Sequence, residues 1–251
     1  YLTKQGRSLG VSDADLIKIA VRTLGLDELS PFDPEKRVIE YAIRDGASKR
    51  LVDMTVEEIV HETASESPAP GGGSVAAAVG ALGAALGTMV ANLSSHKRGW
   101  DDRWEEFSKV AEAGKRCHDE LLHLVDEDTE AFNRIMAAWK ADKAHRDAAI
   151  QDATRYAIEV PLRVMRTALD AMGICEAMAE RGMEASLSDA AVGALCTRTA
   201  VLGAGLNVRI NAQDLTDEAA KAKFLAEAGA MEEEARRREQ AVVDGVAARL
   251  G

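Results

Sequence analysis

The chain has 251 residues, a formal net charge of −11 and only 4% aromatic residues. A surface this acidic argues against nucleic acid or an anionic membrane as a partner, because both attract basic surfaces. An anionic small molecule would need a local basic patch. With few aromatic residues and five prolines, the composition favours helices over sheet. Three widely separated cysteines predict reduced thiols in a cytoplasmic protein, with neither a disulfide framework nor a zinc motif.

Residues 1–45 are expected to be the C-terminal remnant of an α+β domain, because they are too few to form a core of their own. The chain begins at Tyr1 and not at Met, which suggests a piece of a longer polypeptide. Ser12 and Asp13 are expected to cap a helix that Gly25 stops. Residues 37–43 are interpreted as a short strand or an extended segment.

The polar residues 46–50 are the expected linker, and residues 51–251 are expected to form one all-α domain, a bundle of long up-and-down or orthogonal helices. Thr55 should cap the first of its helices. Pro161 should kink or divide a long helix over residues 146–180. The other expected long helices cover residues 103–140, 189–213 and 216–250. In the last of these, three i,i+4 pairs beginning with Glu232/Arg236 are interpreted as a solvated face.

A glycine loop opens the helical region. Two prolines before it favour extended backbone, and Gly71, Gly72 and Gly73 can bring their amides against a bulky group. Ser74 is expected to be the N-cap of the following helix, whose free N–H groups suit an anionic or carbonyl-bearing ligand. A turn that merely starts a closely packed helix remains an equal alternative, because the loop lacks the lysine of a phosphate-binding loop.

The helix after this loop is rich in alanine and glycine. Residues 75–93 are the only candidate membrane span in the sequence, but they are too weakly apolar for a convincing lipid-facing helix. We therefore expect a buried helix that its neighbours approach closely.

Asp128 interrupts an apolar stripe on the expected helix over residues 103–140. The stripe has helical spacing, whereas Asp126, Glu127 and Glu130 fall elsewhere on the wheel, where water can reach them. A carboxylate among apolar neighbours loses solvation, which raises its pKa toward the range useful for proton transfer. The alternatives are a structural aspartate bonded to a neighbouring helix, or a stripe that ends earlier. The stripe comprises Leu121, Leu124, Val125, Phe132, Ile135 and Met136.

Other polar residues give weaker signals. Asn207 and Asn211 share one face of an apolar helix, so their amides either bind a heterocycle or cross-link helices. Lys97 and Arg98 are candidate contacts for an anionic group, although such residues are usually solvated. The histidines make no metal pair, and we expect neither a metal site nor a redox cofactor.

Several segments, taken together, resemble the cyclodeaminase/cyclohydrolase domain of the formimidoyltransferase-cyclodeaminase family over roughly residues 51–250. Residues 1–45 resemble the end of the formimidoyltransferase domain that precedes it, at Leu24–Asp27, Pro31–Phe32 and Ile39–Tyr41. The segments of the larger domain are Leu51–Asp53, Pro70–Ala77, Leu124–Phe132, Val160–Leu162, Ser188–Asp189 and Asn207–Asn211.

This resemblance implies an all-helical domain that forms a homodimer or higher homo-oligomer, with folate bound at the dimer interface. The implied reaction closes 5-formimidoyltetrahydrofolate to 5,10-methenyltetrahydrofolate with loss of ammonia, in histidine degradation. The substrate is then a tetrahydrofolate derivative, with no tightly bound cofactor. The second aspartate of the family's Val-Asp-x-Asp motif, the catalytic acid/base, is Asp128 here.

The remaining site roles are expectations from residue type. The glycine loop with Ser74 and the two asparagines would position the pterin and aminobenzoyl groups. Lys97 or Arg98 would meet the glutamate tail. Two other functions remain open: a methenyltetrahydrofolate cyclohydrolase, and a folate-binding or assembly module without catalysis.

Overall fold

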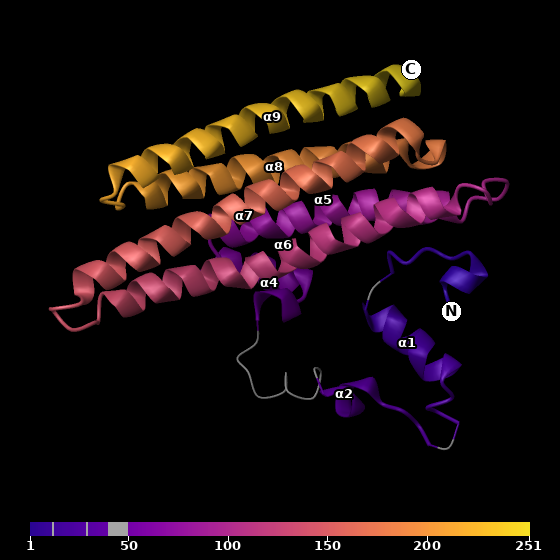
Figure 1. The fold of residues 1–251 in the computed structure, drawn as a ribbon, viewed down its shortest axis with the longest axis horizontal. Coiled ribbons are helices and arrows are strands. Elements are labelled where there is room, and N and C mark those ends of the chain that lie inside the picture. Colours follow the sequence, from indigo (N-terminus) through magenta and orange to yellow (C-terminus); the bar gives the residue numbers. More distant parts are fainter. Residues whose placement is uncertain (12, 29, 40–49) are drawn as a thin grey trace.

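Five long helices dominate the computed structural model, which describes residues 1–11, 13–28, 30–39 and 50–251. They lie alongside one another with alternating direction (Figure 1). No strand occurs in these ranges, and the expected all-α bundle is confirmed. The five helices are α5 (Gly72–Ser95), α6 (Trp104–Ala138), α7 (Arg146–Arg181), α8 (Leu187–Ala212) and α9 (Glu218–Leu250).

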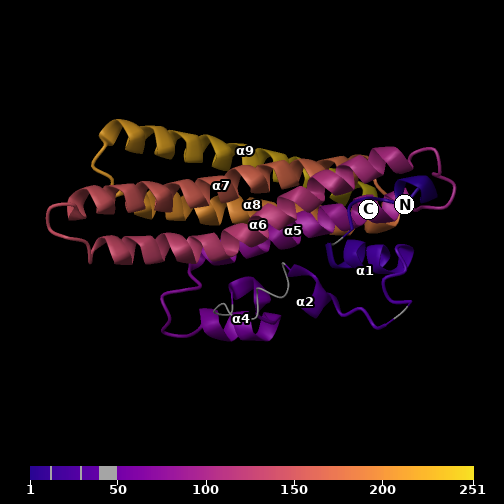
Figure 2. The same ribbon diagram turned by 60° about the horizontal axis from the view of Figure 1, so that its bottom comes forward.

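Short elements precede the bundle. They are η1 (Thr3–Gln5), α1 (Asp13–Thr23), α2 (Pro34–Arg37), η3 (Leu51–Asp53) and α4 (Val56–Thr63), and η4 (Glu184–Ser186) joins α7 to α8. Figure 2 shows α4 on the same side of the bundle as α1 and α2. Thr55 caps α4 as expected, since its hydroxyl accepts from the Glu58 amide at 3.2 Å.

The N-terminal expectations are only partly covered by the structure. Arg37 ends a short helix and does not begin a strand, because Pro34 supplies a favourable first helical residue. The rest of the expected strand, residues 40–43, lies outside the described residues, as do Ser12 and residues 46–49 of the expected linker. Gly25 follows α1 with a φ of 65°, in the left-handed region that glycine tolerates.

Helix α5 is the centre of the bundle and packs against α6, α7 and α8. A Cβ at Gly83 would lie 2.7 Å from the carbonyl oxygen of Gly193 on α8, so the missing side chain lets the two backbones touch. By length and composition, α5 and the segment Glu184–Ala212 are each apolar enough to cross a membrane. In the fold, 61% and 44% of their most apolar windows are buried. The expectation that residues 75–93 form a buried helix matches this packing.

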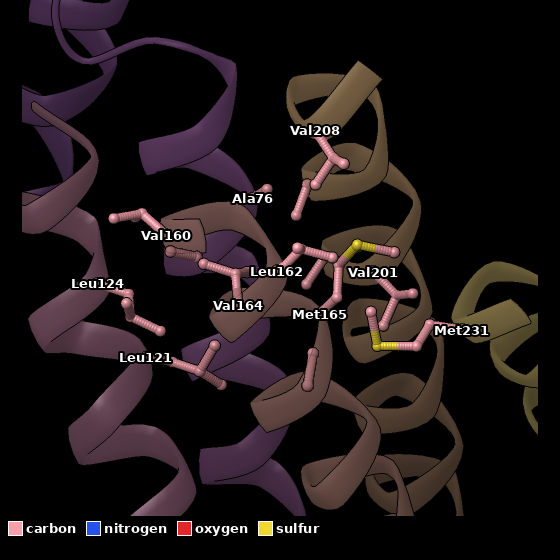
Figure 3. Close-up of a cluster of buried hydrophobic side chains, with 14 of the residues drawn as sticks. Ala76, Leu121, Leu124, Val160, Leu162, Val164, Met165, Val201, Val208 and Met231 are labelled. Carbon is pink, nitrogen blue, oxygen red and sulfur yellow. The ribbon is translucent and has the colours of Figure 1, made fainter. Parts of the chain in front are cut away.

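The main core lies where α5, α6, α7, α8 and α9 meet (Figure 3). Leu121 and Leu124 project from α6 toward the central residues of α7, and Met231 reaches in from α9. Helix α7 runs through Pro161 without being divided, so of the two expected effects division is wrong and a kink stays a prediction.

The charged run of α9 is also only partly solvated. Glu232 is 7% exposed, because Arg209 of α8 lies over it and pairs with its carboxylate. Arg238 pairs across to Glu176 of α7 at 2.7 Å. The expected solvated face therefore includes ion pairs that fasten α9 to the bundle.

Helix α5 is shorter than its neighbours. It has 24 residues, against 35 in α6 and 36 in α7. At 1.5 Å per residue, α6 and α7 exceed it by about 16 Å. Both helices run past the start of α5 in Figure 1, so the N-terminus of α5 lies inside the bundle.

The close contact of α5 with α8 leads to a prediction about stability. Gly83→Ala would place a methyl group against backbone atoms of α8, and we expect it to lower the free energy of unfolding by about 1–3 kcal/mol. Gly229→Ala on α9 is the matched control, because nothing lies within 4 Å of its added Cβ. Denaturant unfolding should show that control unchanged or slightly more stable. Equal stability of the two variants would contradict the close packing.

Candidate functional site

The N-terminus of α5 is bonded to a carboxylate from α6. The Oδ2 atom of Asp128 accepts the Ser74 amide at 2.8 Å and the Ser74 hydroxyl at 2.9 Å. Neither of these bonds uses Oδ1. The amide belongs to the first turn of α5, where N–H groups have no partner within the helix, so Asp128 caps α5 from another element.

Ser74 is not the N-cap that the sequence predicts. Helix α5 begins two residues earlier, with Gly71 as an extended N-cap at φ −100° and ψ −168°. Ser74 therefore lies at the third helical position, where its amide and hydroxyl both point to Asp128. The glycines make this possible, since a Cβ at Gly73 would lie 2.1 Å from the Asp128 Oδ1 atom.

The environment of Asp128 acts on its pKa in two directions. Burial in the bundle raises the pKa of this carboxyl, and the two bonds from Ser74 lower it. The net result is a pKa above the ordinary value for aspartate. The structure thus combines both interpretations of Asp128: it is bonded to a neighbouring helix, and its pKa has moved in the direction that suits proton transfer.

Asn207 of α8 lies on the other side of the glycine loop. A Cβ at Gly72 would be 3.6 Å from its Nδ2 atom, and that amide also donates to the Gly203 carbonyl at 3.0 Å. Asn211, one turn further along α8, donates to the Ala157 carbonyl of α7 at 2.7 Å and so cross-links two helices. The structure therefore brings Asp128, the glycine loop with Ser74, and Asn207 together.

Lys97 and Arg98 lie elsewhere in the chain. They follow the C-terminal end of α5, and a 24-residue helix is about 36 Å long. The Lys97 ammonium lies 3.8 Å from the centre of the Trp100 ring. Within one chain these two residues are far from Asp128, and their role with a glutamate tail stays a prediction.

The sequence did not reveal a second polar cluster beside Asp128. Glu127 was expected in solvent, but its side chain is only 13% exposed because α7 packs over it. Burial acts to raise its pKa, but the Tyr156 hydroxyl, Arg163 and His123 outweigh that effect and hold the pKa below its usual value. Arg163 Nη1 lies 3.0 Å from its carboxylate. Tyr156 and Arg163 are two turns apart on one helix, and this spacing is the sequence signal that could have indicated the polar cluster.

Asp126, two residues before Asp128, anchors a different segment. Its Oδ1 atom accepts the Leu51 amide of η3 at 2.7 Å, and burial raises its pKa. It was expected in solvent and is in fact partly buried. The hydroxyl of Thr129, next to Asp128, is buried without a hydrogen-bond partner among the described residues.

Cavities flank this site. A cavity of about 670 Å³ lies on the Asp126 side, lined by charged residues that include Arg50, His123 and Arg134. A smaller one, about 270 Å³, lies between the ends of α6, α7 and α8 and includes Asn211. The described ranges contain no group of three or more His, Cys, Asp or Glu residues placed to hold a metal ion.

Comparison with known proteins points to one family. A family model described as formiminotransferase-cyclodeaminase matches residues 55–230, and one described as the formiminotransferase domain matches residues 1–44. The crystal structure of formiminotetrahydrofolate cyclodeaminase from Thermotoga maritima is similar, with a TM-score of 0.68 and 30% identity. That likeness covers 77% of this chain and 98% of the other.

Similar curated proteins point to the same family. Formimidoyltransferase-cyclodeaminase from Rattus norvegicus is 36% identical over 240 residues, which are 93% of this chain and 44% of the relative. The chain thus spans less than half the length of that relative. Methenyltetrahydrofolate cyclohydrolase from Methylorubrum extorquens is 35% identical over 192 residues, which are 71% of this chain and 92% of the relative.

The Ser74 contact gives a prediction that needs no substrate. Ser74→Ala removes one of the two bonds that favour the ionised Asp128, so the pKa of Asp128 should rise further. A carboxyl-carbon NMR titration should follow that shift. The bond stabilises only the carboxylate, so the stability difference from wild type should be greatest above the pKa and should shrink as pH falls.

Ser95→Ala, at the far end of α5, is the control and should leave the Asp128 titration unchanged. An unchanged titration in the Ser74 variant would show that the hydroxyl does not reach the carboxylate in solution.

Proposed function

The chain belongs to the formiminotransferase-cyclodeaminase family, and from this premise we propose that it converts 5-formimidoyltetrahydrofolate to 5,10-methenyltetrahydrofolate and ammonia. The observation that carries the proposal is the partly buried Asp128 carboxylate beside the glycine loop. Its Oδ2 atom is fixed by Ser74, so Oδ1 is the atom available to a substrate. In this role the enzyme contributes to histidine degradation.

The chemistry requires one proton carrier. N10 of the folate attacks the carbon of the cationic formimidoyl group and forms a tetrahedral centre that carries both nitrogens. Asp128 takes the proton from N10 and gives it to the nitrogen of the formimidoyl group, which then leaves as ammonia. The methenyl cation remains between N5 and N10. Such proton transfer contributes about 10²–10⁴-fold to the rate.

Two further properties of the site assist this step. The negative charge of Asp128 favours the cationic starting group and the methenyl cation product. Its raised pKa brings the carboxyl closer to neutral pH, where it can both accept and return a proton. Holding N5 and N10 in a five-membered arrangement supplies the proximity.

A cyclohydrolase is the second candidate, because a methenyltetrahydrofolate cyclohydrolase is matched over 92% of its length. That reaction adds water to the methenyl carbon and needs the same carboxylate. The purified chain should be given both substrates in separate assays. Ammonia release from 5-formimidoyltetrahydrofolate decides for the deaminase, and hydrolysis of the methenyl compound alone decides for the cyclohydrolase.

Asp128→Asn tests the assigned proton carrier. We expect turnover to fall by about 10²–10⁴-fold, because the amide cannot accept and return the proton. Folate binding should be largely kept, since the amide keeps the shape and one acceptor oxygen. Steady-state kinetics and calorimetric titration with a folate analogue would measure the two effects separately.

Asp126→Asn is the matched control, because it changes the other aspartate of the same motif. Asp126 holds the Leu51 amide, so its variant should keep most of the turnover. Full activity of the Asp128 variant would remove Asp128 from the mechanism, and a loss confined to the Asp126 variant would reassign the role.

We also propose that the protein works as a homodimer. Apolar side chains at heptad spacing are exposed along α5, and a second row is exposed along α8, which packs against α5. Continuous apolar faces of this size are usually covered by another chain. The rows are Val75, Leu82, Met89 and Leu93 on α5, and Val192, Leu195, Leu206 and Ile210 on α8.

The proposed interface borders the site. Val75 adjoins Ser74, and Leu206 adjoins Asn207, so a second copy on this face would form one wall of the substrate cleft. This position supports the expectation that folate binds where two copies meet.

A charge in this face should separate the copies. Leu82, 65% exposed, becomes buried in the proposed dimer, and Leu82→Glu should raise the dimer dissociation constant by more than about tenfold. Sedimentation velocity over a concentration series would measure it. Leu24→Glu, at an equally exposed leucine outside the bundle, is the control. Identical sedimentation of wild type and the Leu82 variant would place the interface elsewhere.

A further inference from the structure

The small cavity past the start of α5 has an unusual composition. Its volume is about 270 Å³, and it is lined by Ile135, Trp139, Ile150, Thr154, Asn211 and Asp214. It exists because α5 begins late: α6 and α7 continue beyond Gly72, and no part of α5 fills the space between them and α8. Asp128 lies on α6 about two turns before Ile135, which lines this space.

An unused hydroxyl lines the cavity. Thr154 is only 3% exposed, yet its side chain makes no hydrogen bond within the described residues. Thr88, which is also buried, differs because its hydroxyl donates to the Ala84 carbonyl at 2.7 Å. Because Thr154 lines the cavity, its hydroxyl can bond to a ligand atom there.

The polar groups of the cavity are mainly acceptors. The Nδ2 atom of Asn211 is committed to the Ala157 carbonyl, which leaves its oxygen, and Asp214 contributes a carboxylate. No lysine or arginine lines the cavity. The set therefore favours a ligand edge rich in N–H donors and disfavours a carboxylate.

We propose that this cavity binds the aminopyrimidinone edge of the pteridine ring, with Trp139 and the two isoleucines against its faces. This inference rests on the proposed function, because it assigns one part of the folate, the pteridine ring, to one part of the same site. The 2-amino group and the adjacent ring N–H donate to Asp214. The volume holds a ring and is too small for the whole folate.

The placement agrees with the position of Asp128. Seven residues of α6 separate Asp128 from Ile135, which is about 10 Å along the helix. Asn207 lies on α8, and Asp214 lies seven residues later, in the turn just after α8 ends at Ala212. The pteridine can therefore direct N5 and N10 toward Asp128 while its opposite edge lies at Asp214. The aminobenzoyl-glutamate then extends away from the cavity.

Binding of two folate fragments tests this arrangement. Wild type should bind 6-methyltetrahydropterin, and Asp214→Asn should weaken that binding by about 10–100-fold, the range for a hydrogen-bonded charge. Binding of p-aminobenzoylglutamate should be unchanged. With the full substrate, the same variant should raise KM with little change in kcat. Asp244→Asn, an exposed carboxylate on α9, is the matched control.

Thr154→Val separates a ligand contact from a structural role. Losing an unused hydroxyl should leave the unfolding temperature unchanged or raised, while binding of the pterin fragment weakens by about 2–10-fold. Thr88→Val breaks an existing bond, so it should lower the unfolding temperature and leave binding unchanged.

The outcomes distinguish the two proposals. Equal binding of the pterin fragment by wild type and Asp214→Asn overturns the subsite, even if ammonia is released normally. A lowered unfolding temperature in Thr154→Val overturns it as well. Lack of turnover by wild type rejects the proposed function alone, provided that the variants still lose pterin binding.

Discussion

The bond between Asp128 and the start of α5 is the contact on which the site depends. A helix N-terminus inside a bundle has amides that need acceptors, and a buried carboxylate needs donors. Each satisfies the other here, at 2.8 Å between the Ser74 amide and Asp128. The lack of a side chain at Gly73 makes this contact possible, because any side chain there would occupy the position of the carboxylate.

The late start of α5 has a consequence for the whole end of the bundle. Since α6 and α7 are longer, the last turns of α6 and α8 and the first turns of α7 surround space that α5 does not fill. Asp128 and Asn207 lie against the start of α5, and Asn211 and Asp214 line the cavity. The late start of α5 thus leaves the cavity open, and the capping contact fixes the Asp128 carboxylate beside the start of α5.

Much of this arrangement could be predicted from the sequence. Helical periodicity gave the long helices, the glycine loop indicated close approach, and the break in an apolar stripe singled out Asp128. The incorrect predictions share a physical cause: contacts between helices determine where α5 starts and which glutamates are buried. Ser74 is a good local N-cap, but an acceptor on another helix moved the helix start to Gly72. Glu127 and Glu232 were predicted in solvent, but arginines from neighbouring helices allow their burial.

The two aspartates of the motif illustrate why pattern alone was not enough. Residues two apart on a helix point in directions about 160° apart, so Asp126 and Asp128 cannot serve one ligand group. Each accepts a backbone amide from a different segment: Leu51 of η3 for Asp126 and Ser74 of α5 for Asp128. Helix α6 therefore positions two separate segments with one short motif. Asp128 lies beside the glycine loop, which supports the proposed role in proton transfer, whereas the contact of Asp126 with Leu51 positions η3.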